Sequence, residues 1–102
     1  MIKCTCINDK YKPNKIPKEK WIENGKEYTI IFTTFVLPQR ELGFQLEELD
    51  LDKSCFPYEY FLANRFGFTK EEFDKLAEFI KECNDIAVSV KELMQQTKII
   101  AP

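Results

Sequence analysis

The chain has 102 residues, of which 44% are hydrophobic and 14% aromatic, so it can form one folded domain and is not a disordered chain. Its formal net charge of −2 provides no overall attraction to nucleic acid or to an acidic membrane. The sequence has no histidine, which excludes Ser-His and Cys-His catalytic pairs, and it contains none of the glycine motifs that bind phosphates or dinucleotides.

The ends and the hydropathy of the chain predict its compartment. No apolar stretch approaches the length of a membrane span, and residues 1–6 lack the apolar segment of a secretory signal. We therefore expect a cytoplasmic protein that has reduced thiols and no membrane partner.

The N-terminal part is predicted to be one strand followed by a lysine-rich loop. Residues 2–8 alternate loosely and are rich in β-forming side chains, which places Cys4 and Cys6 on the same face of a strand. Residues 9–20 are polar and contain two prolines, so neither a helix nor a paired strand is expected there.

The longest predicted strand covers residues 27–36. Asn24 and Gly25 form a turn signal before it, and Pro38 ends it because proline lacks the N–H that a ladder needs. Together with the following strand it should supply the core, for which we expect these side chains: Tyr28, Ile30, Phe32, Leu42, Phe44 and Leu46.

Three more strands are expected before residue 69. Leu42, Phe44 and Leu46 alternate with less apolar residues, which is the pattern of a strand with one buried face. Residues 56–61 form an aromatic run that predicts the next strand, and residues 65–68 are expected to close the sheet. Closing four or five short strands into a small barrel would also remove their exposed edges.

A helix is predicted to begin at Thr69. Thr69 and Glu72 have the spacing of a capping box, in which the hydroxyl accepts from the third helical amide while the glutamate reaches back. Phe68 and Phe73 have the spacing of the hydrophobic staple that accompanies such a box. Apolar residues then recur at intervals of three and four, as in an amphipathic helix.

The length of this helix decides a prediction about assembly. If residues 69–97 form one helix, it spans roughly 43 Å and outruns a 68-residue barrel of roughly 28 Å. The overhanging apolar stripe would then pair with a second copy, and we predict a homodimer through Ile86, Val90, Leu93 and Met94. The alternative is a break at Asn84-Asp85, which folds a second short helix back and leaves a monomer.

Two short patterns resemble a group of short uncharacterised proteins from bacterial and phage genomes. One is Gly25-Lys26-Glu27-Tyr28 at the start of the long strand, and the other is Ala63-Asn64-Arg65-Phe66. The group has a kGkxYxV pattern and an axRF pattern at these places. The resemblance covers residues 1–68 and implies an SH3-like barrel, which serves in general as a binding module. It implies no particular activity.

These observations predict an α+β fold. A small SH3-like antiparallel β-barrel over residues 1–68 is followed by a C-terminal amphipathic helical extension over residues 69–102, both within one domain. The runner-up is an open α+β sandwich, in which the helix lies across one face of the sheet.

The candidate chemistry is sparse. Cys4 and Cys6 are two residues apart while Cys55 and Cys83 are isolated, so the paired C-x-x-C spacing of a zinc site is absent and buried thiols are expected. Adjacent carboxylates such as Glu47 and Glu48 point in different directions and indicate solvated surface charge. We therefore predict no cofactor, no catalytic residue and no metal.

Two regions could bind a partner. The lysines of residues 10–26, interleaved with Tyr11 and Trp21, are compatible with phosphate contacts, but the remaining surface is acidic, which makes nucleic acid the less favoured partner. Trp21, Tyr58 and Tyr60 could line a peptide groove, although such residues more often belong to the core or its rim. The predicted function is a non-enzymatic protein-binding or accessory module of a bacterium or phage. The alternatives are a nucleic-acid-binding module, a small enzyme and a structural zinc protein.

Overall fold

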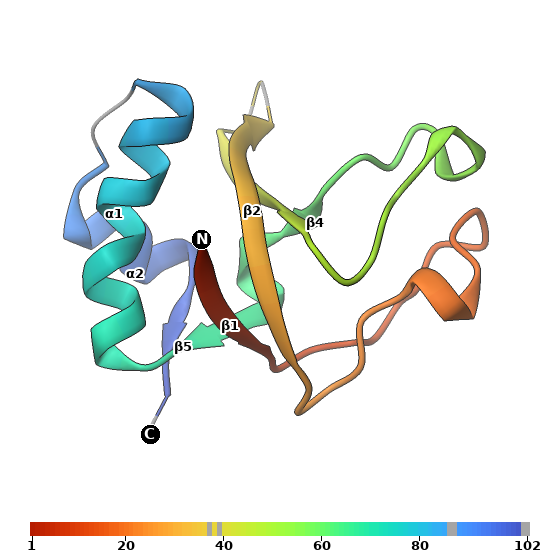
Figure 1. The fold of residues 1–102 in the computed structure, drawn as a ribbon, viewed down its shortest axis with the longest axis horizontal. Helices are drawn as coiled ribbons and strands as arrows, with labels where there is room; N and C mark the ends of the chain where they lie inside the picture. Colours follow the sequence, from red (N-terminus) through yellow and green to blue (C-terminus); the bar gives the residue numbers. More distant parts are fainter. Residues whose placement is uncertain (37, 39, 86–87, 101–102) are drawn as a thin grey trace.

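The computed structural model describes residues 1–36, 38, 40–85 and 88–100. Over these residues six strands form one sheet in the order β4-β3-β2-β1-β5-β6, and two α-helices pack beside it (Figure 1). The strands are β1 (Ile2–Cys6), β2 (Glu27–Val36), β3 (Glu41–Leu46), β4 (Phe61–Leu62), β5 (Phe66–Phe68) and β6 (Lys98–Ile99). The helices are α1 (Lys70–Asn84) and α2 (Val90–Gln96), with 3-10 turns η1 (Lys18–Lys20), η2 (Lys53–Cys55) and η3 (Ala63–Arg65). The predicted α+β class is confirmed.

Strand β2 has the bounds that the sequence predicted and pairs with β1 on one side and with β3 on the other. Gly25 has a φ of 86°, a conformation open to glycine, and turns the chain into β2. Its N–H donates to the carbonyl of Cys6 at 2.7 Å, which closes the β1–β2 loop at its base. Cys4 and Cys6 share one buried face of β1, as expected.

A β-bulge in the middle of β2 changes which side chains reach the core. Ile30 lies opposite Leu46 and Phe32 lies opposite Gln45, so Ile31 is an extra residue. Beyond the bulge Thr33 is buried, whereas the predicted core residue Phe32 is only half-buried. The prediction for Phe32 is wrong because the extra residue reverses the alternation. The other five predicted core side chains are buried.

The sheet curls without closing over the described residues, so the predicted closed barrel is wrong. Phe44 of β3 meets Phe66 and Phe68 of β5 at ring-centroid distances of 5.7 and 6.0 Å, although β2 and β1 lie between these strands. Strand β4 pairs over two residues and then turns into η3, so it remains an edge. The opposite edge is β6, which runs parallel to β5, whereas the sequence predicts only helix in the C-terminal extension.

The predicted strand over residues 56–61 is wrong, because only Phe61 belongs to β4. The residues before it follow η2 and form a turn, in which the Tyr58 N–H donates to the carbonyl of Cys55 at 2.8 Å. Cys55 is fully buried and anchors this turn, while Phe56 points outward. The aromatic run predicts a strand, but the hydrogen bonds of this turn are made by the backbone and leave no mark on the side-chain pattern.

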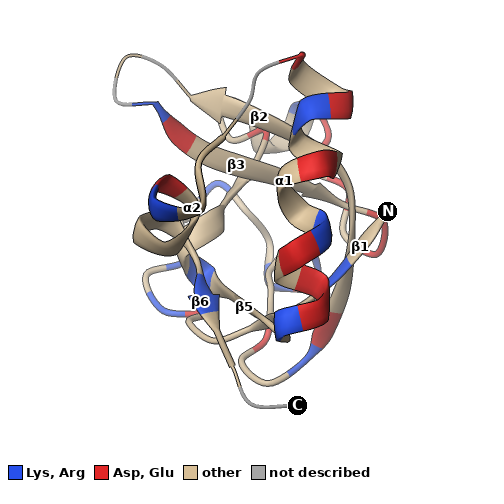
Figure 2. Cartoon of the chain, turned by 90° about the vertical axis from the view of Figure 1, so that its left-hand side faces the viewer, with Lys and Arg blue, Asp and Glu red and all other residues tan. Residues whose placement is uncertain are grey.

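Helix α1 begins as predicted. The Thr69 hydroxyl accepts from the N–H of Glu72 at 3.2 Å, and the Glu72 carboxylate accepts from the N–H of Thr69 at 3.0 Å. Phe73, Leu76 and Ile80 are buried on its inner side. Figure 2 shows charged residues along the outer side of α1 and α2 beside it. The helix therefore seals one face of the curled sheet.

The predicted single helix over residues 69–97 is wrong, and the alternative break at Asn84-Asp85 is confirmed. Asp85 adopts a left-handed conformation with a φ of 54°, and its N–H donates to the carbonyl of Lys81, which ends α1. Ser89 caps α2 through the N–H of Glu92. The 15 residues of α1 span about 22 Å, within molecular extents of 33 × 30 × 21 Å. No part of this helix overhangs among the described residues.

This break removes the geometric basis of the predicted dimer interface. Leu93 is buried in the core of its own chain, while Val90 and Met94 are exposed on α2. Ile86 lies outside the described residues. The homodimer itself stays a prediction, since nothing in a single chain tests it.

The left-handed end of α1 yields a stability prediction. We expect Asp85→Gly to raise the free energy of unfolding by about 0.5 kcal/mol, because glycine adopts a positive φ without strain and carries no negative charge at the helix C-terminus. Asp85→Ala should instead lower it by about 1 kcal/mol. Urea unfolding followed by circular dichroism measures both changes. If alanine stabilises as much as glycine, the helix continues through this position.

Candidate functional site

Two long loops lie together at the end of the molecule opposite the helices (Figure 1). They are the β1–β2 loop, residues 7–26, and the β3–β4 loop, residues 47–60. An ion pair between the Lys20 ammonium and the Asp52 carboxylate joins them. This contact lowers the pKa of Asp52 to about 2 and raises the pKa of Lys20. We call this region the loop end.

Trp21 holds the base of the β1–β2 loop. Its indole lies 5.8 Å from the ring of Phe61 between centroids, and its N–H donates to the carbonyl of Asp9 at 2.7 Å. The guanidinium of Arg65 covers the indole at 4.9 Å from its centroid. Trp21 therefore caps the core. This is the alternative that the sequence left open, in which the aromatic side chain belongs to the core or its rim. Its side chain is half-buried.

Arg65 fixes the path of the same loop. Its Nη1 donates to the carbonyls of Asn8, at 3.2 Å, and Lys10, at 2.7 Å. Burial lowers the pKa of Arg65, so the guanidinium depends on these carbonyls and on Trp21 in place of water. The resemblance marked this arginine only as part of a pattern, and the structure shows what it does.

A conservative substitution tests this role. We expect Arg65→Lys to lower the free energy of unfolding by about 1–2 kcal/mol, since an ammonium cannot lie flat on Trp21 while reaching two carbonyls. Chemical denaturation measures the change. The control is Lys70→Ala, which removes an exposed ion pair to Asp74 and should change stability by less than about 0.5 kcal/mol. Equal effects of the two variants would contradict a specific role for Arg65.

The β3–β4 loop presents an aromatic side chain on a fixed frame. The Asp52 carboxylate accepts from the N–H of Ser54 at 3.0 Å and begins η2, and Cys55 is buried beneath it. Phe56 is 66% exposed and Tyr58 is 40% exposed. A hollow of about 620 Å³ lies beside Phe56, lined by Leu51, Asp52, Lys53, Phe56 and Glu59.

The predicted binding residues do not form one groove. Tyr60 packs on β3, where a Cβ added to Gly43 would lie 3.0 Å from the Cβ of Tyr60, and it is half-buried. Phe61, which follows Tyr60, faces the core with Trp21. Of the three predicted residues, Tyr58 alone is exposed at the loop end. Phe56, which the sequence assigned to a strand, is the more prominent aromatic side chain.

The start of the same loop is tied to the sheet through Glu48. Loss of hydration opposes its ionisation, but the N–H and hydroxyl of Thr29 each donate to its carboxylate at 2.9 Å. The net effect lowers the pKa of Glu48. Lys3 completes the network by donating from Nζ to the Thr29 hydroxyl oxygen at 2.9 Å.

A lowered pKa in the folded state predicts a pH dependence of stability. The contribution of the Glu48 carboxylate should be present above its unfolded pKa of about 4.3 and disappear as the pH falls through the folded value. We expect Glu48→Gln to cost about 1 kcal/mol or less at pH 7, with the difference from wild type vanishing near pH 3. Glu47→Gln is the neighbouring control, because the Glu47 side chain makes no hydrogen bond to a described residue, and it should change stability at pH 7 by less than about 0.5 kcal/mol. Thermal unfolding at both pH values measures it, and a difference independent of pH would be evidence against the network.

The thiols of Cys4 and Cys6 are poorly placed for nucleophilic chemistry. Cys4 and Cys6 are fully buried, and burial raises the pKa of both, which keeps them protonated and poorly nucleophilic at neutral pH. Within the described part of the chain, no three Cys, Asp or Glu side chains gather as metal ligands would. None of the described helices is long and apolar enough to cross a bilayer.

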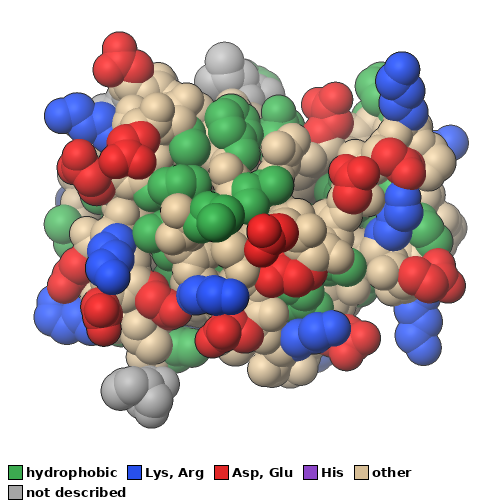
Figure 3. Space-filling model, in the orientation of Figure 1, with side chains coloured by type: hydrophobic (Ala, Val, Ile, Leu, Met, Phe, Trp, Pro, Cys, Tyr) green, Lys and Arg blue, Asp and Glu red, His purple; other side chains and the backbone are tan. Residues whose placement is uncertain are grey.

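The surface in Figure 3 is divided. Hydrophobic side chains gather over the second half of β2, and side chains of both charges are interleaved at the loop end.

A scan against protein-family models finds no match, and searches of curated proteins and of solved structures find none either. The function is therefore inferred from this geometry alone.

Proposed function

We propose that this protein is a non-enzymatic binding module that captures a short segment of another protein at the loop end. The observation that carries the proposal is Phe56, a large apolar side chain that is 66% exposed beside a hollow of about 620 Å³. Tyr58 adds a second exposed aromatic ring in the same loop. Tyrosine and phenylalanine are enriched where proteins bind other proteins.

Energetics favour a binding role for Phe56. Fully burying a phenylalanine side chain contributes about 1.5–3 kcal/mol, and only part of this is realised within the chain because Phe56 is 66% exposed. The backbone that carries the side chain is held in place, because η2 and buried Cys55 precede Phe56 and the Tyr58 N–H that follows it donates to the Cys55 carbonyl. A loop backbone that is already ordered loses little further entropy when a partner covers the ring.

The charges around the hollow indicate the chemistry of the partner. Residues 47–60 contain five acidic residues and one lysine. Glu48 and Asp52 are bound within the protein, and Glu59 lines the hollow. The expected ligand is a segment with an apolar side chain for the hollow and a lysine or arginine beside it.

The nucleic-acid alternative has weaker support. Lys12 donates from Nζ to the carbonyls of Pro13 and Ile16, and Lys20 pairs with Asp52, so two loop lysines hold the loop itself. An enzymatic role is also disfavoured, because burial raises the pKa of the Cys4 and Cys6 thiols and makes them poor nucleophiles.

We also propose that the sheet has an SH3-like arrangement of strands. The strand order β4-β3-β2-β1-β5 and the position of η3 between β4 and β5 support it. The protein is further proposed to be a cytoplasmic protein of a bacterium or phage.

Peptide selection tests the proposal. Displayed random dodecapeptides are selected on the wild-type protein, and the enriched peptides are measured by fluorescence anisotropy. We expect sequences that combine apolar and basic residues, and an affinity loss of at least tenfold, about 1.4 kcal/mol, on Phe56→Ser. Its stability should change by less than about 0.5 kcal/mol, because the side chain is exposed.

The matched control is Tyr11→Ser, which removes an 86% exposed aromatic side chain from the neighbouring loop. Peptide affinity should survive this change. Peptides that bind Phe56→Ser as tightly as wild type would refute the site. Oligothymidylate binding that weakens steeply with added salt and depends on Tyr11 would assign the loop end to nucleic acid instead.

A further inference from the structure

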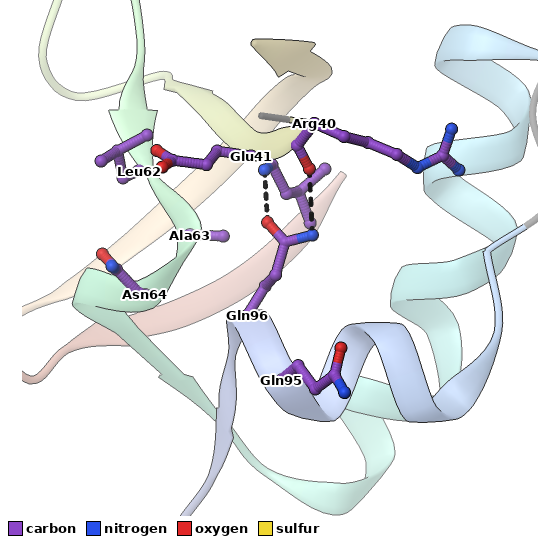
Figure 4. Close-up of a pocket in the computed structure, with 8 residues that line it drawn as sticks. Arg40, Glu41, Leu62, Ala63, Asn64, Gln95 and Gln96 are labelled. Carbon is purple, nitrogen blue, oxygen red and sulfur yellow. Dashed lines mark hydrogen bonds between the residues drawn. The ribbon is translucent and has the colours of Figure 1, made fainter. Parts of the chain in front are cut away.

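The edge of β3 is closed by a side chain where a neighbouring strand would lie. The Gln96 carboxamide, at the end of α2, accepts from the N–H of Leu42 at 2.5 Å through Oε1. Its Nε2 donates to the carbonyl of Arg40 at 3.2 Å (Figure 4). Strand β4 cannot fill this place because the chain enters η3 after Leu62.

The two bonds have the pattern of a β-ladder. In a parallel pair, a residue on one strand lies opposite residue j of the other strand. Its N–H donates to the carbonyl of residue j−1, and its carbonyl accepts from the N–H of residue j+1. Around Glu41 these groups are the Arg40 carbonyl and the Leu42 N–H, and the carboxamide of Gln96 satisfies both. The edge therefore already recognises an amide group in the position of an added strand.

A pocket of about 260 Å³ adjoins this clamp, between β3 and the start of η3. Leu62, Ala63 and Asn64 line one side, and Gln95 lies at the other. It is smaller than the usual site of a drug-sized molecule, roughly 300–1,000 Å³, and suits a stretch of backbone with one side chain.

Two charged side chains line the pocket, and only one of them, Arg40, forms an ion pair with a described residue. The Arg40 guanidinium pairs with Glu92 at 2.8 Å and lies 4.6 Å from the ring centroid of Phe35, so its charge is neutralised. Glu41 makes no ion pair with a described residue, and its side chain extends toward Leu62 in Figure 4. The pocket therefore complements a positive charge.

We propose that the β3 edge at Glu41 binds an extended, basic segment of a partner protein as an added strand, with a lysine or arginine of that segment beside Glu41. Gln96 occupies the edge when the partner is absent. The partner replaces both carboxamide bonds with peptide bonds of the same kind, and further pairing along β3 adds to them. This surface is separate from the loop end and does not depend on it.

Displacement of Gln96 needs only rotation of its side chain. Leu93 is buried, and the Thr97 hydroxyl donates to the Leu93 carbonyl at 2.7 Å, so α2 keeps its place through other contacts. A freed glutamine regains rotamer entropy, which offsets part of the lost bonding. The clamp therefore acts as a competitor that lowers the apparent affinity for the partner without blocking it.

The test uses a capped hexapeptide of alternating valine and lysine, with the valine-glutamate hexapeptide as its charge-reversed counterpart. Binding to the ¹⁵N-labelled full chain is followed by NMR at the Leu42 amide. We expect the basic peptide to shift this amide and the acidic peptide to bind at least fivefold more weakly. Gln96→Ala should bind the basic peptide at least threefold more tightly than wild type.

Gln96→Ser gives a second variant, since its side chain is too short to replace the bonds to the Leu42 N–H and the Arg40 carbonyl and should also open the edge. Met94→Ala is the matched control on the same helix, because its exposed side chain does not line the pocket, and its affinity should stay within twofold of wild type. Circular dichroism checks that each variant is folded. Unchanged affinity in both Gln96 variants, or shifts confined to the loop end, would overturn the proposal. Self-association of Gln96→Ala through the Leu42 amide, seen by sedimentation, would also overturn it and assign the edge to a second copy.

Discussion

The aromatic contact between β3 and β5 is the constraint on which the rest of this structure depends. Phe44 can reach Phe66 and Phe68 only if the two strands between them curl the sheet strongly. Strand β2 provides that curl, because it pairs with β1 and β3 and carries a bulge at Ile31. Once the sheet has curled, its remaining open face is narrow enough for α1 to cover, and the core is complete. A flat sheet of the same strands would leave these rings apart and partly in water.

Features that depend on neighbouring residues in the chain could be predicted from the sequence. The bounds of β2, the alternation of β3 and the capping box at Thr69 are all encoded within a few residues. Features that depend on contacts between distant parts of the chain could not be predicted from it. The bulge at Ile31 leaves no signal in a run of β-branched and aromatic residues, and β6 pairs with β5 across two helices. The break at Asp85 was visible as an alternative, since aspartate tolerates a left-handed conformation.

The candidate site shows the same division. Residue type pointed to Trp21, Tyr58 and Tyr60, of which Tyr58 is exposed at the loop end. It could not distinguish an aromatic side chain that caps the core from one that faces solvent. Trp21 is held by a carbonyl and by Arg65, and both partners come from positions distant in sequence. The aromatic pattern places Phe56 in a strand, because the turn that directs it outward is built from backbone bonds around buried Cys55 and leaves no mark on that pattern.

The brevity of β4 links the two surfaces proposed to bind partners. Strand β3 has six residues and β4 has two, so most of the β3 edge lacks a paired neighbour. Toward one end the missing residues form the β3–β4 loop, which carries Phe56 outward. Toward the other end the chain turns into η3 and leaves the edge at Glu41 to the side chain of Gln96. A longer β4 would bury both places and stabilise the sheet. The fold instead keeps them open, at the cost of ladder bonds, which is the compromise expected where a domain uses its sheet edge and its loops for recognition.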